Sequence, residues 1–220
     1  MIEVKNLYKS YGKKDNRSEI FVDASLKVEE GELVALMGRS GSGKSTLLNI
    51  LSGLQTPDSD SVSINGRKIN YDNSRERILL RRDTIGYVIQ DFGLISRRSA
   101  WENVTIMVRS KKYKSDDHRL VHRLFSELGI ADKENSYPQY LSNGEKQRVA
   151  IVRALIDDKK IILADEPTGA LDVENAGEVM RIFRSLTETR NCTIIIATHD
   201  PEIARSCDRI IYIKNKGIEG

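Results

Sequence analysis

The sequence has few cysteines and aromatic residues and no long apolar run. Cys192 and Cys207 are the two cysteines among 220 residues, and their spacing suits neither a disulfide framework nor a metal site. We therefore expect a reducing compartment and two inert thiols. The longest apolar runs, such as residues 193–197, have the length of a strand, and no signal peptide is recognisable at Met1. Any contact with a membrane should be made through a partner.

An excess of charge of one sign is also lacking. Lys and Arg total 35 against 32 Asp and Glu, which gives a formal net charge of +3. Nucleic-acid-binding domains usually carry a concentrated basic footprint, so this mixed composition argues against DNA or RNA as a partner. A chain of 220 residues can bury a sizeable core without disulfides. We expect one compact unit or two closely joined subdomains.

What the sequence does contain is a complete phosphate-binding loop. Residues 38–46 read Gly-Arg-Ser-Gly-Ser-Gly-Lys-Ser-Thr and follow the short apolar run Leu33–Met37. Glycines let backbone N–H groups converge on phosphate oxygens, and the N-terminus of the next helix adds partial positive charge. The pattern predicts a nucleoside triphosphate with Mg²⁺, with Lys44 on the β- and γ-phosphates and Ser45 on the metal ion. The residues expected to contact the nucleotide here are Gly38, Arg39, Ser40, Gly41, Ser42, Gly43, Lys44, Ser45 and Thr46.

A second chemical element is the pair of carboxylates Asp165 and Glu166, which follows the apolar run 161–164. Such a pair can be a solvated turn, but a chain with a phosphate loop needs a carboxylate at a strand end to orient the metal ion. We expect Asp165 to hold Mg²⁺, mostly through coordinated water, and Glu166 to be the general base that polarises the attacking water. His199 follows the apolar run 193–197, and the residues alone leave a structural and a catalytic role equally open.

Strand and helix patterns alternate along most of the chain. Asn65-Gly66 predicts a tight hairpin, and residues 99–160 are helical in pattern throughout. The strand-type segments are 2–8, 20–28, 33–37, 61–64, 67–69, 84–89, 161–164, 193–197 and 209–213, and further helices are expected at 47–51, 74–82 and 173–189. This order predicts an α/β fold with a mainly parallel core sheet and ligand loops at the carboxyl ends of its strands.

Together these elements make the whole chain resemble the ATP-binding subunit of an ATP-binding-cassette (ABC) transporter. The family's signature, usually Leu-Ser-Gly-Gly followed by Gln or Glu, is matched by residues 141–145, Leu-Ser-Asn-Gly-Glu. Residues 170–172, Ala-Leu-Asp, match the loop that crosses to the partner subunit. The motifs stand in the family's order and at its usual spacing. The resemblance implies a P-loop NTPase fold of ABC type, with an antiparallel β subdomain and a helical signature subdomain at 99–159 inserted between core segments 1–98 and 160–220.

The resemblance also implies roles that spacing leaves open. Gln90 matches the glutamine that reaches Mg²⁺ and senses the permease, His199 matches the switch histidine on the γ-phosphate, and Tyr11 matches the aromatic that stacks on adenine. Ser142, Asn143, Gly144 and Glu145 match the segment that contacts ATP bound to the opposite subunit. The implied catalytic residues are Glu166, His199, Lys44 and Gln90, and the implied metal ligands are Ser45, Gln90 and Asp165.

Within the family, residues 141–155 and 165–172 resemble the MacB/LolD branch of macrolide and peptide exporters, lipoprotein-release systems and antimicrobial-peptide resistance transporters. This implies a cytoplasmic ATPase, peripheral on the inner face of the membrane, that dimerises around two ATP molecules and drives a permease. An FtsE-like regulatory ATPase, which transports nothing, would have the same motifs. A soluble ABC protein of DNA repair or translation is disfavoured, because the sequence lacks a long coiled-coil insertion and a tandem second cassette.

Two residues depart from the family pattern. Asn143 stands where the first signature glycine usually lies, and Asn adopts left-handed backbone angles more readily than other non-glycine residues. We therefore expect ATP binding to tolerate it, and any effect to show in the rate of hydrolysis or the geometry of closure. Asp60 replaces a glycine common in the turn after Pro57, which we interpret as a turn variation.

Two further expectations concern the permease and the end of the chain. The permease contact should lie at residues 90–104, where Trp101 is either a docking anchor or ordinary core. The few residues after Ile213 should leave no room for the regulatory domain appended to many importer subunits.

Overall fold

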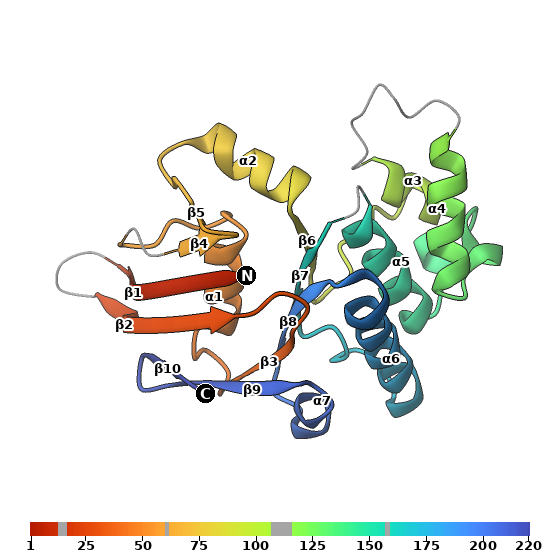
Figure 1. The fold of residues 1–220 in the computed structure, drawn as a ribbon. Helices are drawn as coiled ribbons and strands as arrows, with labels where there is room; N and C mark the ends of the chain where they lie inside the picture. Colours follow the sequence, from red (N-terminus) through yellow and green to blue (C-terminus); the bar gives the residue numbers. More distant parts are fainter. Residues whose placement is uncertain (13–16, 60–61, 107–115, 157–158) are drawn as a thin grey trace.

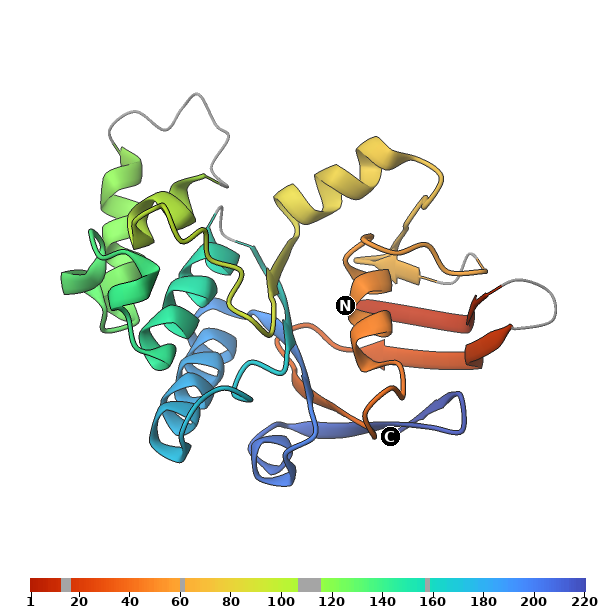
Figure 2. The same ribbon diagram turned by 180° about the vertical axis from the view of Figure 1, so that it is seen from behind.

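Two β-sheets and a set of helices make up the computed structural model, which describes residues 1–12, 17–59, 62–106, 116–156 and 159–220 (Figure 1). Among these residues, one sheet has the strand order β10-β9-β3-β8-β7-β6 and the other has the order β2-β1-β4-β5. The helices that contain the signature region gather at one end of the molecule and the second sheet lies at the other end, as the reverse view also shows (Figure 2). The predicted α/β fold with two kinds of sheet is confirmed.

The core sheet is parallel from β9 to β6, and only β10 pairs antiparallel, with β9. In this register Met37 lies opposite Thr198, and Asp165 lies opposite Ala197. The carboxyl ends of β3, β7 and β8 therefore meet at one edge of the sheet. The strands of the core sheet are β3 (Leu33–Met37), β6 (Ile85–Val88), β7 (Ile161–Asp165), β8 (Thr193–Thr198), β9 (Arg209–Lys214) and β10 (Gly217–Glu219).

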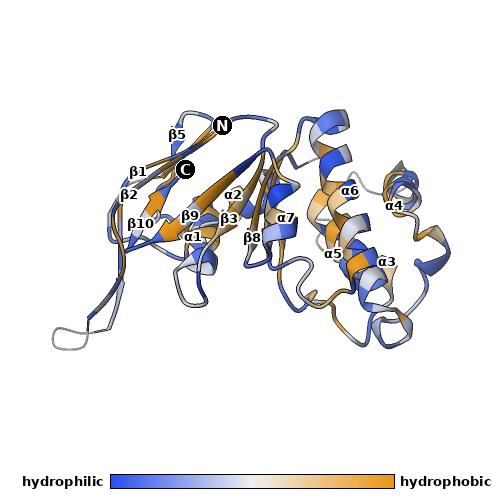
Figure 3. Cartoon of the chain, turned by 90° about the horizontal axis from the view of Figure 1, so that it is seen from below, coloured by the Kyte–Doolittle hydropathy of each residue, from blue (hydrophilic) through white to orange (hydrophobic). Residues whose placement is uncertain are grey.

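Both faces of the core sheet are buried, and each face belongs to a different hydrophobic cluster. Along β8, Ile194 and Ile196 pack into one cluster and Ile195 and Ala197 into the other, because successive side chains of a strand point to opposite faces. Figure 3 shows the strands as hydrophobic ribbons between more mixed helices. Burial on both sides explains why these strands read as continuous apolar runs in the sequence.

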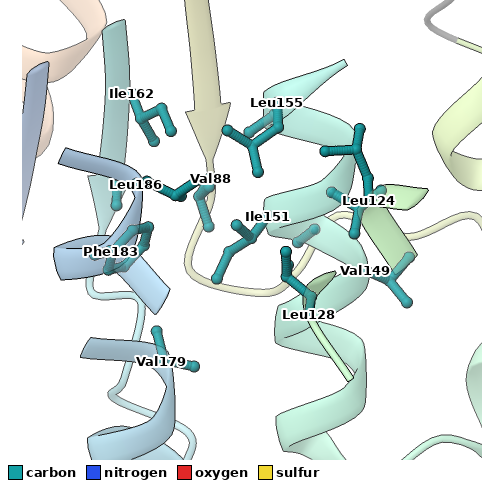
Figure 4. Packing of buried hydrophobic residues seen from close by; sticks show 14 of the residues in the cluster. Val88, Leu124, Leu128, Val149, Ile151, Leu155, Ile162, Val179, Phe183 and Leu186 are labelled. Carbon is teal, nitrogen blue, oxygen red and sulfur yellow. The ribbon is translucent and has the colours of Figure 1, made fainter. Parts of the chain in front are cut away.

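Helices cover one face of the core sheet. In Figure 4, Ile151 and Leu155 of α5 (Asn143–Leu155) and Phe183 of α6 (Val173–Arg190) lie near Val88 and Ile162 of the sheet. Val149 lies on the opposite side of α5, near Leu124. The other face packs against α1 (Lys44–Leu51) and the second sheet. The helical region thus shares one hydrophobic cluster with the core sheet, and the predicted subdomain boundaries at 99 and 159 stay a prediction.

The second sheet is antiparallel. Its strands are β1 (Ile2–Tyr11), β2 (Ser18–Val28), β4 (Val62–Ile64) and β5 (Arg67–Lys68). The predicted hairpin between β4 and β5 is confirmed, with φ of 50° at Asn65 and 75° at Gly66, as a tight turn of this type requires. The β1–β2 pairing is longer than predicted, because Tyr11 pairs with Ser18. Asp60 and Ser61 lie outside the described residues.

The helical region holds α3 (Ala100–Thr105), α4 (Asp116–Glu127) and α5, with short 3₁₀ turns at Ala131–Lys133 and Pro138–Tyr140. As predicted, no strand occurs in the part of 99–160 that the structure describes. The predicted helix α2 is present at Ser74–Asp83. Within the described ranges, no helix is both long enough and apolar enough to span a membrane.

Two elements near the end of the chain escaped prediction. Helix α7 (Pro201–Arg205) has five residues, too few to show a helical period. The turn from β9 to β10 has positive φ at Asn215 (50°) and Lys216 (63°), and a lysine gives no turn signal in a sequence. Helix α7 packs on β3, β8 and β9, and β10 extends the edge of the core sheet by pairing with β9, so both elements depend on contacts with strands of that sheet.

The sheet and α5 approach each other closely at Gly86 of β6. A Cβ at Gly86 would lie 2.2 Å from the carbonyl oxygen of Ala154, a backbone atom that cannot rotate away. We expect Gly86→Ala to destabilise the protein by about 1–3 kcal/mol or more, measured by urea unfolding. The control is Gly177→Ala in α6, where a Cβ meets no atom within 4 Å and should add about 0.5–1 kcal/mol of stability. Equal stabilities for the two variants would contradict the close approach.

Candidate functional site

The predicted phosphate loop connects β3 to α1 as a tight turn. A Cβ at Gly38 would lie 2.4 Å from Ser42 Oγ, so a side chain there would close the loop on itself. Gly43 has a φ of 110° and caps α1, and a Cβ there would lie 2.7 Å from Cγ2 of Ile20. Both positions therefore require glycine, the first for close approach and the second also for its backbone angle.

Lys44 and the N-terminus of α1 supply the donors of the loop that line the pocket described below, whereas Ser42 does not line it. Ser42 Oγ is buried without a hydrogen-bond partner among the described residues. The buried Lys44 donates to the carbonyl oxygen of Gly38 over 2.9 Å, and its Nζ lies 3.8 Å from Oε1 of Glu166. Lys44 and the N-terminus of α1 form a donor set that fits phosphate oxygens.

Glu166 sits on a strained backbone directly after β7. Its φ is 47°, a left-handed angle that costs a non-glycine residue roughly 1–2 kcal/mol. Its N–H donates to the carbonyl oxygen of Ala197 over 2.9 Å, which ties this turn to β8. The side chain lies between Lys44 and His199, whose Nδ1 is 2.9 Å from Glu166 Oε2. The backbone strain therefore accompanies a side chain placed between two groups that can contact a phosphate.

Asp165 ends β7 beside the phosphate loop. Burial raises the pKa of its carboxyl, and the charge of Glu166 adds to this rise, while a hydrogen bond from Ser45 and the charge of Lys44 oppose it. A carboxylate and a hydroxyl are hard oxygen ligands of the kind that Mg²⁺ prefers. Among the described residues, no group of three or more His, Cys, Asp and Glu side chains could hold a metal ion. The residues thus fit a Mg²⁺ that takes most of its ligands from phosphate and water.

These groups line one pocket of about 640 Å³. Its walls come from six separate stretches of the chain: Tyr11, Ile20, Ser40, Gly41, Gly43, Lys44, Ser45, Thr46, Gln90, Asp165, Glu166 and His199. The structure thereby brings together most of the residues predicted around the phosphates, although their individual roles stay predictions. Gly38, Arg39 and Ser42 of the predicted loop do not line this pocket. Ile20 was not predicted, because an apolar residue in a strand gives no signal for a ligand site.

Tyr11, predicted to stack on adenine, lies at the end of β1 beside α1. Its hydroxyl is 3.3 Å from Thr46 Oγ1 and accepts a hydrogen bond from Gln55 Nε2, and Lys9 Nζ lies 5.3 Å from the centre of the ring. The ring is half-exposed at the pocket and is held by its polar tip, which suits an aromatic that stacks on a base. Gln55 had no sequence signal, since its contact depends on the fold.

The signature residues lie elsewhere. Ser142 caps α5 and forms a reciprocal capping box with Glu145, and none of the residues 142–145 lines the pocket. Asn143 is the first residue of the α5 helix and does not have a positive φ. The expected reason for its tolerance, a left-handed backbone, was therefore wrong: a helical N-terminus makes no such demand.

Comparisons with known proteins agree with this geometry. The model of the ABC transporter family matches residues 21–169. The macrolide export ATP-binding/permease protein MacB of Neisseria meningitidis is 42% identical over 219 residues, which cover 98% of this chain and 33% of MacB. The bacitracin export ATP-binding protein BceA of Halalkalibacterium halodurans is 37% identical over 217 residues, which cover 98% of this chain and 85% of BceA.

A solved structure has the same fold. The dimeric structure of MJ0796, a bacterial ABC transporter cassette, superposes with a TM-score of 0.90 at 37% identity, over 100% of this chain and 97% of MJ0796. A second structure of that protein shows a dimeric post-hydrolysis state bound to ADP and Pi, with the same score.

The raised pKa of Asp165 predicts a pH-dependent stability. Because its folded pKa lies above the ordinary value, the charged carboxylate destabilises the folded state at neutral pH, and this cost disappears as pH falls below the unfolded pKa. We expect Asp165→Asn to raise the melting temperature of the nucleotide-free protein at pH 7, with a smaller gain near pH 4.

Asp172→Asn is the matched control for this measurement. Hydrogen bonds from Asn175 lower the pKa of Asp172, so neutralising that side chain should lower the melting temperature at pH 7. A lower melting temperature at pH 7 for Asp165→Asn as well would contradict the assignment of a burial cost to Asp165.

Proposed function

The chain belongs to the ABC transporter family, and from this premise we propose that it powers a membrane exporter by closing as an ATP-bound dimer. It is an ATP-binding subunit of the family's MacB-like branch and an ATPase. The observation that carries the proposal is the pocket in which Lys44, Asp165, Glu166 and His199 converge at the carboxyl edge of the core sheet. Each group has a part in the transfer of a phosphoryl group to water.

The reaction is an in-line attack by water on the γ-phosphate. Lys44 and the N–H groups at the start of α1 stabilise negative charge on the β- and γ-phosphates. Glu166 orients the water and accepts its proton, and His199, 2.9 Å from Glu166, contacts the γ-phosphate. Mg²⁺, when bound, neutralises phosphate charge, and Ser45, Gln90 and Asp165 would hold it.

A second copy of the chain completes each site. The pocket contains none of the signature residues 142–145 of its own chain, so the contact with the γ-phosphate that the family resemblance implies must come from outside. The dimeric structures of MJ0796, at 37% identity, support a second copy as the source. Ser142, Asn143, Gly144 and Glu145 of one copy would then face the ATP held by residues 38–46 of the other. A single chain should hydrolyse ATP poorly.

The permease would dock on the loop between β6 and α3. The buried side chain of Asn103 accepts from the N–H of Ile95 over 2.6 Å and donates to the carbonyl oxygens of Ile95, Arg98 and Ser99 over 3.1, 3.0 and 2.9 Å. These hydrogen bonds fix the backbone of residues 95–99. Ile95 is 43% exposed on this loop, whereas Trp101 is half-buried against the helical cluster. Ile95 is therefore the better candidate for an anchor.

Export is the direction of transport that the relatives support. MacB is named for macrolide export and BceA for bacitracin export. We place this chain at the cytoplasmic face of the membrane, held there by its permease. The compound would be selected mainly by the permease, because the surfaces described above serve nucleotide and protein contacts. An FtsE-like regulatory role would use the same motor, and ATP-dependent movement of a substrate by the purified complex would separate the two.

Glu166→Gln tests the central mechanism. The amide keeps the size of the side chain and can still contact His199, but it cannot accept the proton of the attacking water. We expect hydrolysis to fall by roughly 10²- to 10⁴-fold while ATP still binds, so that the protein accumulates as an ATP-dependent dimer. Light scattering with and without Mg-ATP measures the dimer, and phosphate release measures hydrolysis.

The matched control carries Lys44→Ala in addition to Glu166→Gln. Loss of a charged contact to the phosphates, worth about 1.5–3 kcal/mol, should weaken ATP binding and keep this variant monomeric. Wild-type hydrolysis by Glu166→Gln would show that Glu166 is not the base. A Glu166→Gln protein that binds ATP but stays monomeric would count against dimer closure.

Ile95→Ser tests the docking loop. We expect the variant to lose most copurification of the permease while its melting temperature and basal ATPase rate stay unchanged, because the side chain is exposed and lies outside the pocket. Leu54→Ser is the control, since Leu54 is exposed to a similar degree on another part of the chain. Equal permease recovery from both variants would place the docking site elsewhere.

A further inference from the structure

Two segments that lie at the starts of α5 and α6 carry the most exposed large hydrophobic side chains of the described residues. Tyr140, just before the α5 cap, is 76% exposed, and Val173, the first residue of α6, is 87% exposed. Isolated apolar residues on a surface are common, but these two flank the signature segment and the loop 170–172. The two segments are also joined within the chain.

The first connection is made by Asn143. Its Nδ2 donates to the carbonyl oxygen of Ala170 over 3.1 Å, across 27 positions of sequence. The capping box of Ser142 and Glu145 already fixes the backbone at the start of α5, so the Asn143 side chain is free to make a tertiary contact. A glycine, the usual residue at this position of the signature, has no side chain with which to make this hydrogen bond.

The second connection is a close contact between Gly144 and Asn175. A Cβ at Gly144 would lie 2.2 Å from Oδ1 of Asn175. The Nδ2 of Asn175 in turn donates to both carboxylate oxygens of Asp172 over 3.0 and 2.8 Å. The Asn175 side chain is thus held between the loop before α6 and the second residue of α5. One turn further along, Arg148 of α5 pairs with Glu178 of α6.

The loop 166–171 links this junction to the pocket. The N–H of Leu171 donates to the carbonyl oxygen of Thr168 over 3.0 Å, and the N–H of Gly169 donates to the carbonyl oxygen of Glu166 over 3.1 Å. Two overlapping turns, 166–169 and 168–171, therefore connect Ala170 to Glu166, and no extended segment lies between them. A displacement of the signature segment would reach Glu166 through this short path.

We propose that Asn143 is a positioning residue that ties residues 140–143 and 170–173 into one rigid surface for a second copy of this chain. The proposal rests on the proposed function for its occupant: the pocket lacks its signature residues, and the cassette of the same fold is a dimer. The occupant is a second copy of the chain because this surface carries residues of the signature 142–145, which the pocket of each chain lacks. Engagement by the second copy would then be transmitted through the turns at 166–171 to Glu166 of the same chain.

Asn143→Asp tests the tie while preserving the helix. The carboxylate has the size of the amide and suits the N-terminus of α5, but it cannot donate to the carbonyl oxygen of Ala170. We expect an unchanged or higher melting temperature, together with hydrogen exchange about 3- to 10-fold faster at the amides of Gly169 and Leu171 in the nucleotide-free protein. Asn143→Gly should give the same exchange, and Ser74→Ala, at the first position of α2, should leave it unchanged.

A second readout concerns the dimer. In the Glu166→Gln background, Asn143→Asp should raise the protein concentration needed for half-dimerisation in Mg-ATP by about 3- to 10-fold, measured by light scattering. Unchanged exchange at 169–171 in both Asn143 variants would overturn the tie, whatever the dimer does. Faster exchange together with no ATP-dependent dimer even in Glu166→Gln alone would instead overturn the second copy as occupant, and with it the proposed function.

Discussion

The parallel pairing of β3, β8 and β7 is the constraint on which the rest of the structure depends. Pairing Met37 with Thr198 and Asp165 with Ala197 sets the ends of three strands at one edge. The phosphate loop and His199 begin directly after β3 and β8, Asp165 is the last residue of β7, and Glu166 follows it. A shift of one residue in either pairing would turn the side chains of a strand to the opposite face and separate groups that now lie within about 3–4 Å of each other.

Two residues of the site destabilise the folded state locally, and burial of the core strands around them offsets this destabilisation. Asp165 is a carboxylate whose pKa burial raises, and Glu166 has a left-handed backbone. Both features are unfavourable locally, and both lie at the end of β7, where Ile161, Ile162 and Leu163 are buried on the two faces of the sheet. Strain of this kind persists only where the surrounding structure over-determines the geometry. The two hydrophobic clusters supply that rigidity.

Each chain holds two halves of different sites. One half is the pocket around residues 38–46. The other is the junction of residues 140–143 with 170–173, none of which lines that pocket. Under the proposed dimer, ATP would be the part that joins them, so its hydrolysis would remove the contact between copies. The short turns from Ala170 to Glu166 give the two halves a mechanical relation within one chain.

The phosphate loop, the carboxylate pair and the alternation of strands and helices could be predicted from the sequence. These depend on neighbours in sequence: glycines for close backbone approach, an apolar run for a buried strand, and Asn65-Gly66 for a hairpin. The family resemblance added Gln90, His199 and Tyr11, which the structure places in the pocket.

Contacts between residues distant in sequence became visible with the fold alone. The bond from Gln55 to Tyr11, the tie from Asn143 to Ala170 and the contact of Gly144 with Asn175 join residues that no local pattern relates. Ordinary polar residues make these contacts, and they give no signal until folding sets their partners at hydrogen-bonding distance. The helical backbone of Asn143, by contrast, has a local cause, because Ser142 and Glu145 form a capping box that fixes the start of α5.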